Sequence, residues 1–372
     1  MILVTDPGTY AAVYPQLLHA PWMGATATDM IFPSFLFIVG VAITFSFASR
    51  IGRGADRTKL AWHVFRRSAT LFLLGLAVNG FPDYHWHTLR LPGILQRIAL
   101  CYLCVGLLYL AGTGPGLESE SSRVVRRVVL FASVAFGLLA IYWALLKWFP
   151  VPGLGAGRLD SLGNLPAYID RAVLGTQHLW AYGLTPGVGV TYDPEGILST
   201  LPAIANTLFG VLAGEWMRTE RSGRQKALGL AVAGLELVVA GLLLSPVLPL
   251  NKRIWTSTFA LFSGGVSLLL FAFFYAVVDL RRSHWWTFFA MVLGSNAILA
   301  FALSSVITIL GDRLRLPGTG AVSLTLHQWG YQHLFASWLA PVHASLAYAI
   351  AIVVLNVLIL VPLYRKRIFL RV

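Results

Sequence analysis

Residues 30–48 read MIFPSFLFIVGVAITFSFA, and no charged side chain interrupts them. A helix needs about 20 apolar residues to cross the hydrocarbon core of a bilayer, so this stretch predicts a membrane-spanning helix. The whole chain has the same character, because its 372 residues are 57% hydrophobic and only 12% charged, with a mean hydropathy of +0.73. These values exclude a soluble globular enzyme, a disordered tail and a nucleic-acid-binding module, and they indicate a polytopic membrane protein.

About nine apolar runs of similar length are present. They lie at roughly 30–48, 64–80, 93–111, 128–148, 197–217, 227–248, 256–278, 287–310 and 344–363. Only helices or closed barrels satisfy the backbone in lipid, and these runs lack the alternation of barrel strands. The predicted fold is therefore an all-α polytopic membrane protein, with residues 1–372 forming a single transmembrane domain.

Two further segments fall outside these spans. The segment 321–340, AVSLTLHQWGYQHLFASWLA, is long enough to cross, but two histidines and two glutamines interrupt it. It is predicted to be an amphipathic interfacial or re-entrant helix on the outer face. The segment at about 149–196 is rich in glycine and proline, which predicts a long non-cytoplasmic loop rather than a folded domain.

The basic residues predict the orientation. Of the 28 Lys and Arg residues, 19 lie on one side of the predicted spans, in the segments 50–67, 123–127, 218–226, 281–282 and 365–371. Eight lie on the other side, and Arg97 falls within a span. Cytoplasmic loops carry the excess of Lys and Arg, so the richer side and the C-terminus are predicted to be cytoplasmic. The formal net charge of +13 is thus a sign of topology and does not require a nucleic-acid partner.

With nine spans and a cytoplasmic C-terminus, the N-terminus falls outside. Residues 1–28 contain neither the charged region nor the apolar region of a signal peptide. We therefore expect residues 1–4 to be the outer end of a further helix that precedes this chain, which gives ten spans in a complete protein. Cys101 and Cys104 provide no disulfide framework and no four-ligand zinc site, so no metal is expected.

Polar groups at membrane depth are costly, so each is a functional candidate until a partner explains it. His19 and Asp29 lie just before the span at 30–48. Asp29 can cap that helix, where its carboxylate meets the positive end of the helix dipole. A purely structural role for His19 is also open, in which its imidazole lies at the lipid headgroup interface.

Gln96 and Arg97 enter the span at 93–111, where an arginine usually faces an aqueous cavity or an anion. Asp193 and Glu195 lie at the entry of the predicted span at 197–217, where helix capping is the alternative role. A polar pocket formed by such groups on the outer half of the bundle suits an enzyme, a transporter or a receptor equally.

The loop that contains Asn251, Lys252, Arg253 and Trp255 places two cations on the outer side, where the charge rule disfavours them. Asn296 lies near the start of the span at 287–310. Both features mark candidate polar positions in the outer half of the bundle.

Four motifs resemble the heparan-α-glucosaminide N-acetyltransferase family, including its bacterial members. They are His19-Ala-x-Trp22-x-Gly24-x-Thr26-x-Thr28-Asp29, Pro92-Gly-Ile-Leu-Gln96-Arg97, Asp193-Pro-Glu195-Gly-Ile-Leu-Ser-Thr-Leu-Pro202 and Asn251-Lys-x-x-Trp255-Thr. The resemblance extends over essentially the whole chain. It implies a membrane-embedded enzyme, with acetyl-CoA on the cytosolic side as donor and the amine of a glucosamine-type sugar or glycan on the other side as acceptor.

The resemblance also implies a homodimer, an embedding lipid bilayer, which in a bacterium is the inner membrane, and a helix before residue 1. It assigns catalysis to His19, as a general base or as a transient acyl carrier, and Asp29 can orient this imidazole. Thr5 stands where the family usually has an asparagine thought to assist catalysis, and its hydroxyl can still donate from a shorter arm.

The remaining expectations concern binding. The substrate-binding set is Gln96, Arg97, Asp193, Glu195, Asn251, Lys252, Trp255 and Asn296. Among these, neutral or cationic donors can stabilise the thioester oxyanion, and the two carboxylates can bind the amine or sugar hydroxyls. The candidates for the CoA phosphates are Arg66, Arg67, Arg126 and Arg127, whose alternative role is to determine topology.

The acetyl donor is expected on the cytosolic side and the catalytic base on the opposite side. We therefore predict a channel between the spans. The alternative function is a transporter of a sugar or lipid intermediate, which needs the same outward pocket but not His19.

Overall fold

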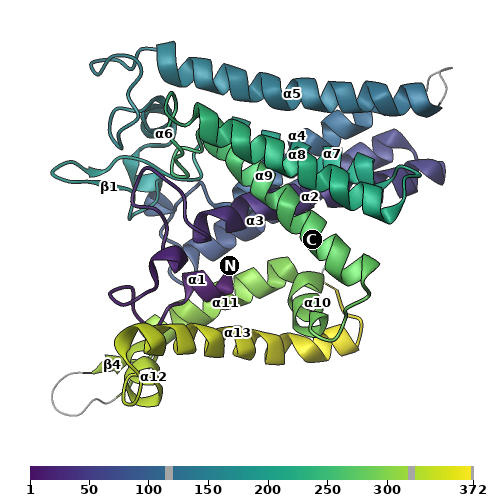
Figure 1. The fold of residues 1–372 in the computed structure, drawn as a ribbon. Coiled ribbons are helices and arrows are strands. Elements are labelled where there is room, and N and C mark those ends of the chain that lie inside the picture. Colours follow the sequence, from purple (N-terminus) through teal and green to yellow (C-terminus); the bar gives the residue numbers. More distant parts are fainter. Residues whose placement is uncertain (114–119, 317–322, 370–372) are drawn as a thin grey trace. The chain divides into compact units, whose positions relative to one another are not determined.

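The structure is a computed structural model that describes residues 1–113, 120–316 and 323–369. In chain order the helices are α1 (Ile2–Thr5), α2 (Ile31–Gly52), α3 (Arg57–Gly80), α4 (Ile94–Gly112), α5 (Glu120–Trp148), α6 (Leu165–Leu174), α7 (Thr200–Met217), α8 (Gly223–Leu244), α9 (Ser257–Phe274), α10 (Thr287–Ser295), α11 (Ala297–Arg313), α12 (Leu326–Leu334) and α13 (Pro341–Arg365). Short helical turns are η1 (Pro15–Leu17), η2 (Thr28–Met30), η3 (Trp86–Thr88), η4 (Thr176–His178) and η5 (Tyr275–Leu280). Figure 1 shows that helices dominate the chain, so the predicted all-α class is confirmed.

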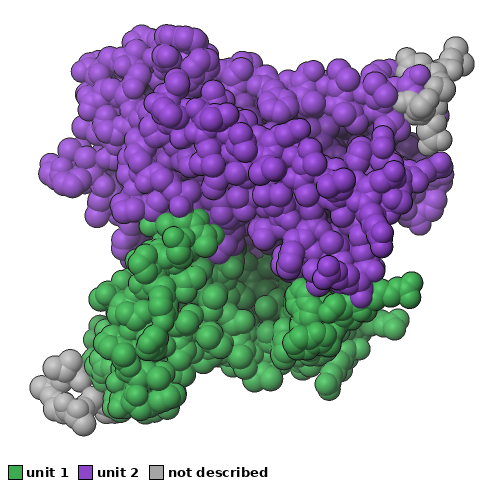
Figure 2. All heavy atoms as spheres, in the orientation of Figure 1, with its two compact units in different colours: residues 1–19, 26–28, 282–372 green, residues 20–25, 29–281 purple. Residues whose placement is uncertain are grey.

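Strands are few and short in the described ranges. β1 (Leu184–Thr185) pairs antiparallel with β2 (Gly189–Val190), and β3 (Arg315–Leu316) pairs antiparallel with β4 (Leu324–Thr325). The chain divides into two compact units (Figure 2). Unit 1 contains residues 1–19, 26–28 and 282–372, and unit 2 contains residues 20–25 and 29–281. The single-domain organisation stays a prediction.

Within the described residues, six helices are long and apolar enough to cross a membrane, and a bent pair makes a seventh candidate. This is fewer than the nine expected. The predicted spans at 64–80 and 197–217 do form helices, α3 and α7, but polar residues such as Arg66 in α3 and Glu215 in α7 lower their hydropathy. α7 tolerates its polar residues because it packs against α2, α4, α5 and α9 and is mostly buried within protein.

The expectation of one continuous span at 287–310 is wrong. α10 and α11 meet at an angle of 86°. The break falls at Asn296, whose φ of −130° and ψ of 42° cannot continue a helix. The sequence Gly294-Ser295-Asn296 supplies residues that favour turns over helix interiors, and this local preference prevails over the apolar pattern.

Two segments predicted to lie outside the spans are ordered. In 321–340, the helix is α12, capped by Thr325 and Gln328 in reciprocal hydrogen bonds; residues 321–322 lie outside the described ranges. Its interfacial position stays a prediction. The long loop at 149–196 contains α6 and the β1–β2 hairpin. It is more structured than expected, because the guanidinium of Arg171 donates to the carbonyls of Thr191 and Leu162 at 2.7 and 2.9 Å.

The core of unit 2 depends on close contact between α2 and α7. A Cβ atom on Gly40 would lie 1.9 Å from the backbone oxygen of Thr207, and one on Gly210 would lie 1.9 Å from that of Phe37. Only glycine permits two helix backbones to approach this closely. The contact fixes α7 against α2 and thereby positions the turn that precedes α7.

Candidate active site

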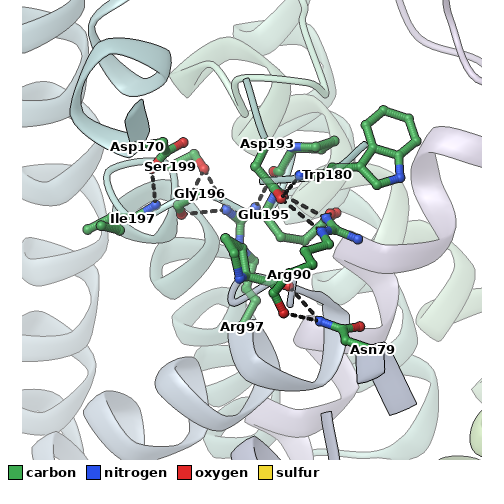
Figure 3. A network of polar contacts seen from close by, with 12 residues as sticks. Asn79, Arg90, Arg97, Asp170, Trp180, Asp193, Glu195, Gly196, Ile197 and Ser199 are labelled. Atoms are coloured by element: carbon green, nitrogen blue, oxygen red, sulfur yellow. Dashed lines mark hydrogen bonds and ion pairs between the residues drawn. The ribbon is translucent and has the colours of Figure 1, made fainter. Parts of the chain in front are cut away.

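A buried charge network surrounds the turn before α7 in unit 2 (Figure 3). Arg90, in the loop before α4, donates from Nε and Nη2 to the two carboxylate oxygens of Asp193 at 2.8 and 2.7 Å, and from Nη2 to Glu195 Oε2 at 2.7 Å. The side chains of Asp193 and Glu195 are 0% and 6% exposed. Burial alone would lower the pKa of Arg90, but the bonds to both carboxylates raise it above its ordinary value.

The turn itself follows from its sequence, Asp193-Pro-Glu195-Gly196. Asp193 Oδ1 accepts the Glu195 N–H at 2.9 Å, which is the local bond that favours aspartate in turns. Glycine at 196 lets the Asp170 carboxylate approach the turn, because a Cβ atom there would lie 1.8 Å from Asp170 Oδ2. The local geometry of the turn therefore positions the two carboxylates that bind Arg90.

Arg97 holds the same turn from the side of α4. Its guanidinium, in a residue that is 1% exposed, donates to the carbonyls of Pro194 and Gly196 at 3.0 and 2.9 Å and to the hydroxyl of Ser199. It also lies 5.1 Å from the ring centroid of Trp255. These acceptors are carbonyl and hydroxyl oxygens, so the role of Arg97 in this structure is to shape the turn.

Lys252 completes the network. Its Nζ lies 4.0 Å from Glu195 Oε1. Burial lowers the pKa of Lys252, with Glu195 opposing the shift. For Glu195 burial would raise the pKa, but Lys252 and Arg90 lower it to about 2, so this group is a carboxylate at neutral pH. Both carboxylates predicted to bind the acceptor amine are thus already paired with cations.

Trp255 lies at the centre of the Asn251 loop. It is fully buried and has a φ of +51°, a left-handed conformation that is uncommon for a bulky residue. Asn251 Oδ1 supports the loop by accepting the Ile254 N–H at 3.1 Å, and the Trp255 indole donates to Asn206 Oδ1 at 2.8 Å. Such strain persists only where the surroundings enforce it, and it concentrates at functional sites.

The segment that follows His19 lies against the Asn251 loop. Within unit 2, the N–H of Gly24 donates to the carbonyl of Leu250 at 2.7 Å, and the N–H of Ala20 donates to Asp29 Oδ2 at 3.1 Å. Asp29 is buried and acts electrostatically on Lys252. The structure therefore brings together Asp29, Arg97, Asp193, Glu195, Asn251, Lys252 and Trp255. His19 is exposed and is covalently joined to Ala20, but it belongs to unit 1.

Two other predicted residues lie in unit 1. The hydroxyl of Thr5 is 3.3 Å from Asp6 Oδ2, and Asn296 Nδ2 donates to the carbonyl of Ile368 at 3.1 Å. Their part in an oxyanion site stays a prediction. In unit 2, Gln96 is buried, and its Nε2 has no hydrogen-bond partner among the described residues, which leaves a donor for a substrate oxygen.

The predicted phosphate-binding arginines lie elsewhere in unit 2. Arg127 pairs with the buried Glu215 at 2.9 Å, near the C-terminal end of α7. α7 has 18 residues and rises about 1.5 Å per residue, so this end is roughly 27 Å from the charge network. Arg67 lies over the ring of Tyr102 at 4.8 Å, and Arg66 and Arg126 are exposed. The structure therefore separates these arginines from the predicted acceptor residues.

Several residues of the network were not among the predicted site residues. They are Arg90, Asp170, Trp180, Asn206 and Arg253. Arg90 directly precedes the motif that contains Arg97, and Arg253 is one of the two cations already marked as unusual, so both carried a signal. Asp170 and Trp180 lie in the long loop, where the sequence gives no indication of which polar residues fold inward.

A cavity of about 170 Å³ lies between α5, α8 and α9 and is lined mostly by apolar side chains. It contains none of the predicted site residues. Among the described residues there is no group of three or more His, Cys, Asp or Glu side chains arranged to hold a metal ion.

No protein-family model matches the chain. In an alignment of 327 positions that covers 77% of its length, the chain is 31% identical to heparan-alpha-glucosaminide N-acetyltransferase from Mus musculus, and in one of 325 positions with the same coverage it is 29% identical to the Homo sapiens protein of that name. It spans about half the length of these relatives, covering 49% and 48% of them. The resemblance carried by the four motifs is thus confirmed by sequence similarity to two heparan-alpha-glucosaminide N-acetyltransferases over three quarters of this chain.

Proposed function

We propose that this protein is a membrane-embedded acetyltransferase that moves acetyl from cytosolic acetyl-CoA to the amine of a glucosamine-type sugar on the non-cytoplasmic side of a bacterial inner membrane. The observation that carries the proposal is the buried network in which Arg97, Asp193, Glu195 and Lys252 meet, because it joins three of the motifs that resemble the acetyltransferase family. Buried charges at the end of a bundle are costly to maintain, which supports a functional role.

In this reaction the sugar ammonium first loses a proton, and the free amine attacks the thioester carbon. The C–N bond forms, the C–S bond breaks, and the CoA thiolate takes up a proton. His19 accepts the proton from the amine, since an imidazole with an ordinary pKa near ~6.5 is suited to this role at neutral pH. Asp29 orients the imidazole, and the unpartnered Nε2 of Gln96 is available as a donor to the developing oxyanion.

His19 has a second route open to it. Its neutral nitrogen attacks the thioester, CoA leaves, and the acetyl-imidazole then transfers acetyl to the amine. Exchange of labelled CoA into acetyl-CoA without sugar supports this route, and absence of exchange supports direct transfer.

Recognition of the acceptor falls to the rings and polar groups around the network. Trp22 and Tyr192 pack edge to face with ring centroids 4.9 Å apart, and Trp180 lies 6.4 Å from Tyr192. The apolar face of a pyranose packs on such rings, while its hydroxyls bond to Asn251 and Lys252. Asp193 and Glu195 hold Arg90 and Lys252 in place. They act on the acceptor amine only indirectly, through the electrostatic field of the site.

The donor is proposed to enter at the other end of α7. The phosphates of CoA lie near Arg66, Arg67, Arg126 and Arg127, and the pantetheine arm passes between the spans. The protein is proposed to form a homodimer in the bilayer.

The test is acetyl transfer from labelled acetyl-CoA to glucosamine by the purified protein, compared with His19→Ala. The matched control is His333→Gln, which alters an exposed histidine in α12. We expect His19→Ala to lose at least ~100-fold in kcat, as is usual when a general base is removed, and the control to stay within twofold. Unchanged transfer by His19→Ala rejects this assignment. Uptake of unmodified sugar without acetylation supports the transporter instead.

A further inference from the structure

Arg253 differs from the other cations of the network in its surroundings. Its guanidinium carbon lies 5.3 Å from the ring centroid of Trp180, against which the guanidinium of Arg90 also lies, at 5.9 Å. The N–H of Trp180 donates to Asp193 Oδ2 at 2.8 Å, which fixes the indole within the network. The guanidinium groups of Arg90 and Arg253 thus both lie near the Trp180 ring, at the edge of the charge network.

The charges of the site do not balance. The cations are Arg90, Arg97, Lys252 and Arg253, and the carboxylates are Asp29, Asp193 and Glu195. The neighbouring Arg171 donates to the carbonyls of Thr191 and Leu162, and burial raises the pKa of Asp170 to about 7, so this pair adds no excess of negative charge. Arg90 takes both Asp193 and Glu195, and Lys252 shares Glu195. The site therefore has one more cation than carboxylate.

Arg97 also lacks a carboxylate partner, but its guanidinium donates to the carbonyls of Pro194 and Gly196 and to the hydroxyl of Ser199. Among the described residues, Arg253 is the cation of the network left without such acceptors. In the part of the chain that the structure describes, Arg253 has no carboxylate within ion-pair distance, and its buried Nε has no hydrogen-bond partner. A buried N–H donor without an acceptor costs free energy, which a bound ligand recovers by supplying the acceptor. A guanidinium that lies against an aromatic ring keeps its N–H groups available for two-point binding of a planar or tetrahedral oxyanion.

We propose that Arg253, supported by Trp180, binds an oxyanion of the substrate, namely a carboxylate, sulfate or phosphate. This rests on the proposed function, because it takes the charge network to be the place where substrate binds. The oxyanion is an acidic substituent on the acceptor sugar, because the phosphates of CoA are proposed to lie at the other end of α7. Arg253 contributes affinity and selectivity, while the groups that move protons are elsewhere.

The experiment compares wild type with Arg253→Gln and Arg253→Lys. The matched control is Arg158→Gln, an outer-loop arginine that is 41% exposed and paired with Asp160 at the surface. Each variant is assayed with glucosamine and glucosamine 6-sulfate as acceptors, and with acetyl-CoA and its 3′-dephospho form as donors.

We expect Arg253→Gln to lower kcat/KM for glucosamine 6-sulfate relative to glucosamine by about tenfold, through KM, as expected for the loss of one charged contact. Arg253→Lys gives a smaller loss, and Arg158→Gln none. The preference for acetyl-CoA over the dephospho donor should stay unchanged in all variants. If that preference falls instead, or if the ratio for the two acceptors changes by less than twofold, the proposal is overturned.

A binding measurement separates this proposal from the proposed function. Thermal unfolding is followed in sodium sulfate and in sodium chloride of equal ionic strength. We expect the extra rise in Tm produced by sulfate to be smaller in Arg253→Gln than in Arg158→Gln, even if the protein acetylates neither sugar. Equal rises in the two variants contradict an anion site at Arg253.

Discussion

The indole Nε1 of Trp255 donates a hydrogen bond to Asn206 Oδ1 at 2.8 Å, and both residues are completely buried. Asn206 Nδ2 in turn donates to the carbonyl of Ala260 in α9 at 3.0 Å. One amide in α7 therefore fixes the ring that lies beneath Arg97 and ties it to the next helix. The strained backbone of Trp255 is maintained by these contacts.

Asn206→Leu should destabilise the protein by about 1–3 kcal/mol, because it leaves a buried indole N–H without an acceptor. Acetyl transfer should fall as well, since Trp255 no longer supports Arg97. The measurement is chemical unfolding in detergent together with kcat. The control is Asn356→Leu, which removes an amide whose Oδ1 already lacks a partner among the described residues. Equal losses in the two variants would show that Asn206 has no special role.

Arg90→Ala should cost about 3–5 kcal/mol of stability, because it leaves Asp193 and Glu195 with fewer cations in a buried site. Arg158→Ala removes an ion pair of similar length, 2.8 Å, but at an exposed position, and should cost less than about 1 kcal/mol. Chemical unfolding of both variants measures the difference. A cost for Arg90→Ala no greater than that for Arg158→Ala would contradict the structural importance of the network.

Asp170 makes stability depend on pH in an unusual direction. Burial raises its pKa to about 7, so the folded state holds this proton more tightly than the unfolded state, whose group titrates near 3.8. The folded state therefore binds more protons between these values, and stability falls as pH rises from about 4 to 7. Asp170→Asn removes this dependence. The Tm of the variant should therefore increase relative to the Tm of wild type as pH rises from 5 to 8.

Asp160→Asn provides a control of opposite sign. The pKa of Asp160 is lowered, because burial, which would raise it, is outweighed by Arg158 and two backbone N–H groups. Its carboxylate therefore stabilises the fold above pH ~4, and the asparagine variant should lose Tm relative to wild type at neutral pH. If the Asp170→Asn difference does not grow with pH, the carboxyl group is not protonated by burial.

Gly40→Ala should prevent α2 and α7 from packing, because the new Cβ would lie 1.9 Å from a backbone oxygen. We expect little folded protein, or a large fall in Tm. Gly137→Ala in α5 is the matched control, since a Cβ there meets nothing within 4 Å, and it should be neutral or stabilising by up to about 1 kcal/mol. Size-exclusion chromatography and thermal unfolding distinguish the two, and a well-folded Gly40→Ala protein would contradict the packing.

The sequence predicted the helical class and most helix positions because an apolar run of membrane-spanning length admits few other structures. It did not predict the break at Asn296, where local backbone preference overrides an unbroken apolar pattern. It also overestimated the number of apolar spans, since α7 is surrounded by protein and can include Asn206 and Glu215.

The candidate site was predictable in part. The turn at Asp193 carried two carboxylates at a helix entry, and the loop at Asn251 carried two cations on the outer side, where the charge rule disfavours them. Both segments join the network. Trp180 and Asp170 were not predictable, because their inward position depends on how the long loop folds over α7. The pairing of Arg90 with Asp193 and Glu195 is likewise a tertiary contact that residue spacing does not reveal.

The most direct test of the central claim is a sided assay in proteoliposomes. Labelled acetyl-CoA is supplied on the cytoplasmic face of the protein and glucosamine only on the opposite face, and labelled N-acetylglucosamine is measured in each compartment. We expect the product to appear on the glucosamine side and His19→Ala to abolish it. Movement of glucosamine without acetylation, or equal product from His19→Ala, would contradict it.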